Sequence, residues 1–162
     1  MNKIAFIVFW TVALFMGEFV CFHLFGRVFL PNLLLLFIIF VDLFFGIRWG
    51  IAAAVFAGII HDSVSISFFG IYLFSYLVCA YLTVLLKKYV YTVGSCASRL
   101  LLVALMVVIC FLVQYVIRLM FQQVPFTEAL RYVLLPQLVT TLLVATVLFE
   151  YLKKCAFKFY VS

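Results

Sequence analysis

The chain has 162 residues, of which 70% are hydrophobic, 20% are aromatic and only 10% are charged. A soluble domain is typically about 45–50% apolar and about 25% charged, so this composition excludes a water-soluble globule and indicates a polytopic membrane protein. The net charge of +6 comes from Lys and Arg beside apolar runs, which is typical of topology signals and argues against nucleic-acid binding. Six spans of ~20 residues would use most of the chain and leave no room for a soluble catalytic or nucleotide-binding domain.

Hydropathy predicts an all-α protein with six transmembrane helices in a single integral membrane domain, residues 1–162. The first span is expected to remain as a signal anchor, because its apolar run is long for a signal peptide and no cleavage site follows. The third span has only ~12 apolar residues, or ~18 Å of helix. It therefore either continues through His61 and Asp62 or forms a shallow hairpin with the second span. The sixth contains Pro136, which predicts a kink. The expected spans are residues 4–22, 30–45, 49–62, 68–86, 100–121 and 130–152.

The basic residues predict the orientation. With six spans and both termini in the cytoplasm, eight of the 11 Lys and Arg lie inside and three lie outside, as the positive-inside rule requires. A five-span alternative would merge residues 30–60 into one helix and place Arg48 in the membrane, at a cost of at least ~2.5–3.5 kcal/mol. The inside set is Lys3, Arg48, Lys87, Lys88, Arg99, Lys153, Lys154 and Lys158, and the outside set is Arg27, Arg118 and Arg131.

Small residues recur at a spacing of four through the third span: Gly46, Gly50, Ala54 and Gly58, followed by Asp62. Residues four apart share one helix face, and small side chains there let a second helix approach closely. Two interpretations stay open. The face either packs against helices of the same chain, or it docks a partner or a second copy of the chain in a homodimer.

Two carboxylates stand out near the third span. Asp62 precedes a serine-containing segment and Gly70, where it either caps a helix end or serves as a functional charge. Asp42 lies toward the cytoplasmic end of the second span, where an ion pair with Arg48 would neutralise it.

The remaining buried polar candidates lie on the first and fifth spans. Gln114 and Arg118 are four residues apart, so they share a helix face that should contact protein and not lipid. Glu18 occupies the outer third of the first span, where an ion pair with Arg118 is geometrically feasible.

The sequence contains no motif for hydrolytic, metal-dependent or nucleotide-dependent chemistry, and none of its five cysteines forms a C-x-x-C pair. We therefore expect a protein that is not an enzyme and has no catalytic residue, metal ligand or cofactor site. An intramembrane aspartic peptidase is disfavoured because Asp42 and Asp62 fall near opposite membrane faces in the six-span arrangement.

The central third of the chain resembles a known family. Pro31 and Asn32 open the second span, the glycine-spaced third span ends in Gly58-Ile59-Ile60-His61-Asp62, and Gly70 follows eight residues after Asp62. A span containing Ala80-Tyr81-Leu82 comes next. This pattern is similar to that of the bacterial rod shape-determining protein MreD family, although Ser65, Ile66 and Ser67 depart from the small residues usual there.

The resemblance implies a non-catalytic scaffold or regulator in the bacterial cytoplasmic (inner) membrane, embedded in the lipid bilayer. It implies association with the bitopic protein MreC and, indirectly, with MreB filaments, the glycosyltransferase RodA and its penicillin-binding transpeptidase, in support of lateral peptidoglycan synthesis. It also implies a fold like that of the substrate-binding subunits of energy-coupling-factor transporters.

A vitamin-binding subunit of such a transporter is the alternative function. Those subunits usually dock through an A-x-x-x-A face on the first span. That face is missing here, because Phe9 lies between Ala5 and Ala13, while Ala53 and Ala57 have the spacing but belong to the third span.

Overall fold

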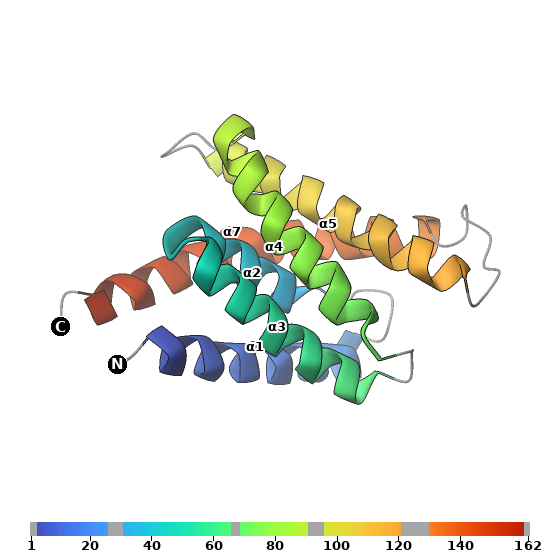
Figure 1. The fold of residues 1–162 in the computed structure, drawn as a ribbon, viewed down its shortest axis with the longest axis horizontal. Coiled ribbons are helices and arrows are strands. Elements are labelled where there is room, and N and C mark those ends of the chain that lie inside the picture. The colour runs from blue at the N-terminus through green and yellow to red at the C-terminus, as the bar shows by residue number, and fades with distance from the viewer. Residues whose placement is uncertain (1–2, 26–30, 66–68, 91–95, 121–129, 161–162) are drawn as a thin grey trace.

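The structure is a computed structural model that describes residues 3–25, 31–65, 69–90, 96–120 and 130–160, in which all the regular structure is helical. Long apolar runs favour helices in a membrane because a helix satisfies its own backbone hydrogen bonds. The elements in chain order are α1 (Lys3–Phe25), α2 (Leu33–Phe44), α3 (Ile47–Val64), α4 (Ile71–Val90), α5 (Cys96–Leu119), the π-helical turn η1 (Leu130–Leu134) and α7 (Leu135–Tyr160) (Figure 1).

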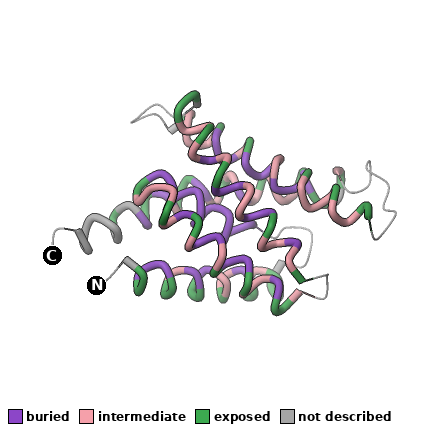
Figure 2. The backbone as a smooth tube through the Cα atoms, viewed as in Figure 1, coloured by how far each residue is buried: buried purple, intermediate pink, exposed green. Residues whose placement is uncertain are grey.

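The helix α2 lies at the centre of the fold and contacts each of the other α-helices. Its residues from Leu33 to Leu43 are all buried, so α2 is purple along nearly its whole length in Figure 2. This agrees with its sequence, because a helix that is hydrophobic on all sides is stable only inside a protein or a membrane. At 12 residues it is ~18 Å long, whereas the hydrocarbon core is ~30 Å thick. The helix α2 is therefore a core helix, and it is shorter than the hydrocarbon core is thick.

Five helices surround α2 and are long and apolar enough to cross a membrane: Ile4–Leu24, Ile47–Val64, Ile71–Tyr89, Ala97–Leu119 and Leu135–Leu152. Their outward sides carry large apolar side chains, such as Phe9 at 63%, Leu143 at 67% and Val147 at 71% exposure. So much exposed apolar surface is stable in lipid but not in water. The chain is a multi-pass membrane protein.

The expected division into six helices is confirmed, but only five of them have the length of a span. The five-span alternative with one helix over 30–60 is wrong, because α2 ends at Phe44 and Gly46, at φ 89°, lies between α2 and α3. A positive φ is readily available only to glycine, so Gly46 permits the break between the two helices. The third span continues through His61 and Asp62 to Val64, as the first of its two interpretations required.

The helix type changes just before Pro136, where the sequence predicts a kink. The π-helical turn η1 runs directly into α7, and Pro136 is the second residue of α7. Pro136 has no N–H to continue the hydrogen bonding of the preceding turn, and a local π-helical adjustment beside a proline can satisfy the freed backbone groups.

Candidate functional site

The first turn of α2 begins inside the protein, where water cannot satisfy its N–H groups. Asn32 caps the helix, because its Oδ1 accepts a hydrogen bond from the N–H of Leu35 at 3.0 Å. The same Oδ1 accepts from the hydroxyl of Tyr76 at 3.2 Å, and the Asn32 N–H donates to Thr141 Oγ1 at 3.1 Å. One asparagine therefore ties the start of α2 to α4 and α7.

Glu18 satisfies another N–H of this turn. Its side chain is 5% exposed, and its Oε1 accepts from the N–H of Leu34 at 3.0 Å. The partial positive charge of a helix N-terminus stabilises a carboxylate placed there. Its Oε2 lies 3.9 Å from Nε2 of His61 on α3. Glu18 therefore joins α1 to both α2 and α3.

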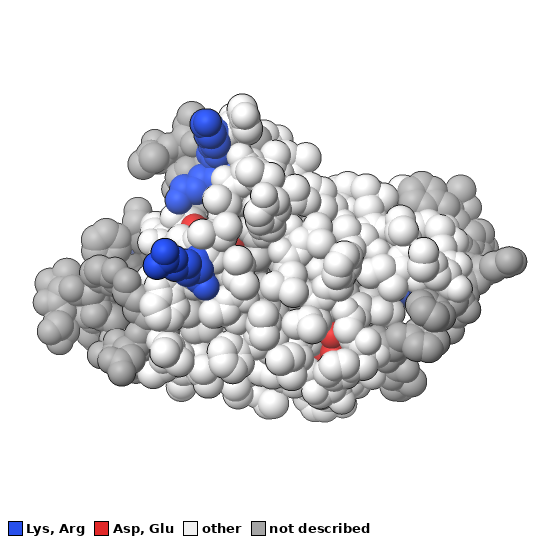
Figure 3. Space-filling model, in the orientation of Figure 1, with Lys and Arg blue, Asp and Glu red and all other residues white. Residues whose placement is uncertain are grey.

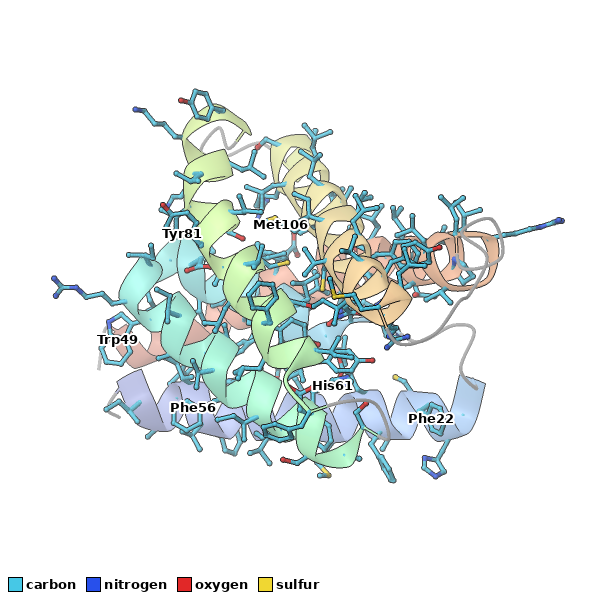
Figure 4. All side chains as sticks on the ribbon, turned by 45° about the vertical axis from the view of Figure 1, so that its right-hand side comes forward. Phe22, Trp49, Phe56, His61, Tyr81 and Met106 are labelled. Carbon is cyan, nitrogen blue, oxygen red and sulfur yellow. The ribbon has the colours of Figure 1, made fainter. Side chains whose placement is uncertain are left out.

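His61 continues these contacts toward α4 and α5. Its ring stacks on Tyr72 with the ring centroids 3.8 Å apart, and a guanidinium nitrogen of Arg118 donates to the Tyr72 hydroxyl at 3.1 Å. Figure 4 shows His61 near the end of α3, beside the start of α4. We call the connected set the polar hub. Its members are Glu18, Asn32, His61, Asp62, Tyr72, Tyr76, Arg118 and Thr141.

The ion pair expected between Glu18 and Arg118 is wrong: both residues belong to the polar hub, but they do not pair directly. Glu18 is engaged by the amide of Leu34 and by His61, while Arg118 donates to Tyr72.

Asp62 caps the next helix in the chain. Its two carboxylate oxygens accept from the N–H groups of Tyr72 at 3.1 Å and Leu73 at 3.0 Å, in the first turn of α4. Gly70 precedes this turn at φ 106°. The geometry is therefore that of the helix cap, the first of the two interpretations of Asp62.

The small-residue face of α3 packs inside this chain. Gly50, Ala54 and Gly58 are buried, and a Cβ added at Gly58 would lie 2.5 Å from the Cα of Leu73 on α4. A Cβ added at Gly50 would overlap the Asp42 carboxylate on α2. The face therefore lets α3 approach α2 and α4 closely. A partner or a second copy of the chain would have to bind elsewhere.

Gly46 and Gly70 have a different role from the buried glycines. A Cβ added at either position would meet nothing within 4 Å, but both residues have a positive φ. Glycine is needed at these two positions because the backbone before α3 and before α4 has a positive φ. It is not needed there for close packing.

Asp42 lies apart from the polar hub, near the other end of α2. It is 1% exposed, and neither carboxylate oxygen has a hydrogen-bond partner among the described residues. The expected ion pair with Arg48 is wrong, because the Arg48 side chain is exposed after the turn at Gly46. Near Asp42, Lys87 of α4 donates to the carbonyl of Leu43 at 2.7 Å.

The other sequence candidates have plainer surroundings. Pro31 is buried just before α2, and its carbonyl accepts from the N–H of Leu33 at 3.1 Å. Gln114 is half-buried on α5 and donates to the Sγ of Cys110 at 3.4 Å, one turn earlier.

The polar hub has the chemistry of a structural network. Glu18 and Asp62 each accept from the first turn of a helix, so neither is positioned as a general base beside a nucleophile. Over the described ranges, His, Cys, Asp and Glu form no group of three that could hold a metal ion. What the hub can do is hold six helices against one another.

Sequence reasoning missed four members of the hub as site residues. His61 was considered only as the residue before Asp62. Tyr72 and Tyr76 lie one turn apart on α4. Their spacing of four residues could have indicated that both hydroxyl groups lie on one face of the helix. Thr141 had no local signal, because its partner Asn32 is 109 residues away in the sequence.

Residues 2–158 match the family model described as rod shape-determining protein MreD. No curated protein and no solved structure matches the chain.

Proposed function

The chain belongs to the rod shape-determining protein MreD family, whose model covers nearly its whole length, and from this premise we propose that it is a non-catalytic scaffold of the bacterial cell-elongation machinery. Membership implies a role in rod shape determination. The finer proposal is that the protein retains MreC in the membrane and thereby supports lateral peptidoglycan synthesis. MreB, RodA and the penicillin-binding transpeptidase would be reached indirectly.

The arrangement of the buried groups supports a scaffold. A scaffold must keep its outer helix faces in fixed relative positions, and the polar hub links α1, α2, α3, α4, α5 and α7 through hydrogen bonds and ring contacts. Because the small-residue face is used inside the chain, MreC or a second copy would meet the exposed apolar sides of the outer helices. Such contacts in lipid depend on shape and van der Waals packing, which a rigid core preserves.

Location and orientation are part of the proposal. We place the protein in the cytoplasmic membrane with both termini inside. The starts of α1, α3 and α5 and the ends of α4 and α7 carry most of the basic residues, which the positive-inside rule assigns to the cytoplasm.

The test is affinity purification of the tagged chain from native membranes in mild detergent. We expect MreC to be recovered with it. Recovery of a transporter's membrane and ATPase subunits, without MreC, would contradict the scaffold proposal.

A packing variant connects the fold to the proposed role. Gly58→Leu places a large side chain against the backbone of α4, so we expect MreC recovery and rod shape to be lost. The matched control is Ala97→Leu, at an exposed position on α5. Full MreC binding and normal cell shape with Gly58→Leu would show that the α3–α4 contact is unimportant for the role.

The alternative function, a vitamin-binding transporter subunit, gains no structural support. Ala53 and Ala57 have the spacing of a docking face, but both are fully buried in α3. The proposed likeness to the fold of those subunits concerns architecture alone.

A further inference from the structure

A groove runs between α5 and α7, away from the polar hub. Its walls include Arg99, Leu100 and Val103 of α5, and Ala145, Phe149 and Glu150 of α7. The groove brings the start of α5 beside the end of the α7 span, so the two helices are antiparallel here.

The charges in the groove are confined to one end of it. Arg99 lies near the start of the Ala97–Leu119 span, and Glu150 lies near the end of the Leu135–Leu152 span. The walls between them and the membrane interior are apolar, with Val103 and Ala145 each 1% exposed. The groove therefore has one cation and one anion near the ends of two membrane-spanning helices, above a short apolar floor.

We propose that this groove is a binding site for one zwitterionic aminophospholipid. The phosphate would bind Arg99, the primary ammonium would bind Glu150, and one acyl chain would lie along Leu100, Val103, Ala145 and Phe149. The proposal does not depend on the function proposed above.

Charge complementarity selects this class of lipid. The guanidinium has five N–H donors, so Arg99 can keep its existing contact in the protein and still hold a phosphate. The nearby start of α5 adds a favourable helix dipole for an anion. Glu150 would repel a purely anionic headgroup, and a trimethylated ammonium has no N–H to donate to it. A headgroup that carries both a phosphate and a primary ammonium can bind Arg99 and Glu150 at the same time.

The test is native mass spectrometry of the purified, delipidated full chain. It would be titrated with phosphatidylethanolamine, phosphatidylcholine and phosphatidylglycerol that carry identical acyl chains. We expect phosphatidylethanolamine to bind roughly fivefold more tightly than either of the others, as for an exposed charge pair.

Two charge variants assign the headgroup contacts. Glu150→Gln should abolish the preference for phosphatidylethanolamine over phosphatidylcholine, and Arg99→Gln should weaken the binding of all three lipids. Arg48→Gln, at an exposed position on α3, is the matched control and should change neither.

A third variant tests the place of the acyl chain. Thr146→Trp adds bulk to the groove wall, whereas Val147→Trp adds it to the neighbouring residue, which is 71% exposed. We expect lipid binding to fall only with Thr146→Trp. Should Thr146→Trp unfold the protein, the charge variants decide the question on their own.

Several results would overturn the proposal. Equal binding of the three lipids would show an unselective annular surface. A preference for phosphatidylglycerol that Glu150→Gln leaves unchanged would show a generic basic surface. Occupation of the groove by a protein helix, detected by cross-linking at Thr146 in native membranes, would replace the lipid with a partner.

Discussion

At the scale of single residues, three buried carboxylates have three different environments. Glu18 and Asp62 each accept hydrogen bonds from the amides of a helix start, whereas Asp42 accepts none among the described residues. A charge inside a membrane is costly, and the N-terminus of a helix offsets part of that cost. Glu18 and Asp62 therefore hold helices in place, whereas Asp42 has no such role among the described residues.

Replacing Glu18 tests this interpretation. Glu18→Ala leaves the buried N–H of Leu34 without an acceptor, so we expect a loss of about 1–3 kcal/mol in the free energy of unfolding. Glu18→Gln keeps an acceptor oxygen and should lose less. Thermal and denaturant unfolding in detergent would measure both, with the exposed Glu150→Ala as control. An Ala variant as stable as this control would show that Glu18 does not support α2.

The two ion pairs that were expected from the sequence are absent from the structure for physical reasons. The Asp42–Arg48 pair fails because the positive φ of Gly46 changes the chain direction between α2 and α3. The Glu18–Arg118 pair fails because a deeply buried helix start offers Glu18 a closer partner in Leu34. Neither effect is visible without knowing which helices are neighbours.

At the scale of helices, the contact between α2 and α3 depends on the space left by Gly50. The Asp42 carboxylate occupies the volume that a side chain at residue 50 would need. Gly50→Ala should therefore destabilise the protein by about 1–3 kcal/mol, the usual cost of overpacking a core.

A double variant tests whether the clash between a Cβ at residue 50 and the Asp42 carboxylate causes this loss of stability. Asp42→Ala makes room at that place, so Asp42→Ala combined with Gly50→Ala should recover most of the stability lost with Gly50→Ala alone. The matched control is Gly58→Ala, whose added Cβ meets Leu73 and not Asp42, and whose stability loss Asp42→Ala should leave unchanged. Strictly additive effects of the Asp42 and Gly50 substitutions would contradict the proposed contact.

The helices themselves were largely predictable from sequence. Apolar runs of ~20 residues located α1, α4 and α5 within a few residues of their ends, because length and hydropathy alone decide such helices. The sequence was less decisive for α2 and α3. Twelve apolar residues are equally compatible with a short span and with a core helix, and only the tertiary structure places α2 inside the protein and extends α3 to Val64.

At the scale of the whole molecule, the basic side chains on the face drawn in Figure 3 are unevenly distributed. In Figure 3 most of the Lys and Arg atoms on the visible face lie toward the end at which both chain termini appear in Figure 1. The exposed basic side chains at this end include Arg48 and Lys88.

Reporter fusions test the resulting orientation. A fluorescent protein fused after residue 162, or inserted at residues 91–95 between α4 and α5, should fluoresce, because both sites are expected in the cytoplasm. Alkaline phosphatase inserted at residues 121–129 should be active, since that site is expected outside. Phosphatase activity at the chain end would reverse the proposed topology.

The shortness of α2 also bears on how the protein is made. A helix of ~18 Å is a poor substrate for independent insertion by the translocon, so α2 must enter the bilayer together with α1 or α3. Its first turn is then completed by Thr141, which leaves the ribosome 109 residues after Asn32. Until α7 is synthesised, the amide of Asn32 therefore lacks its final partner. Biogenesis of this protein is complete only when the last helix arrives.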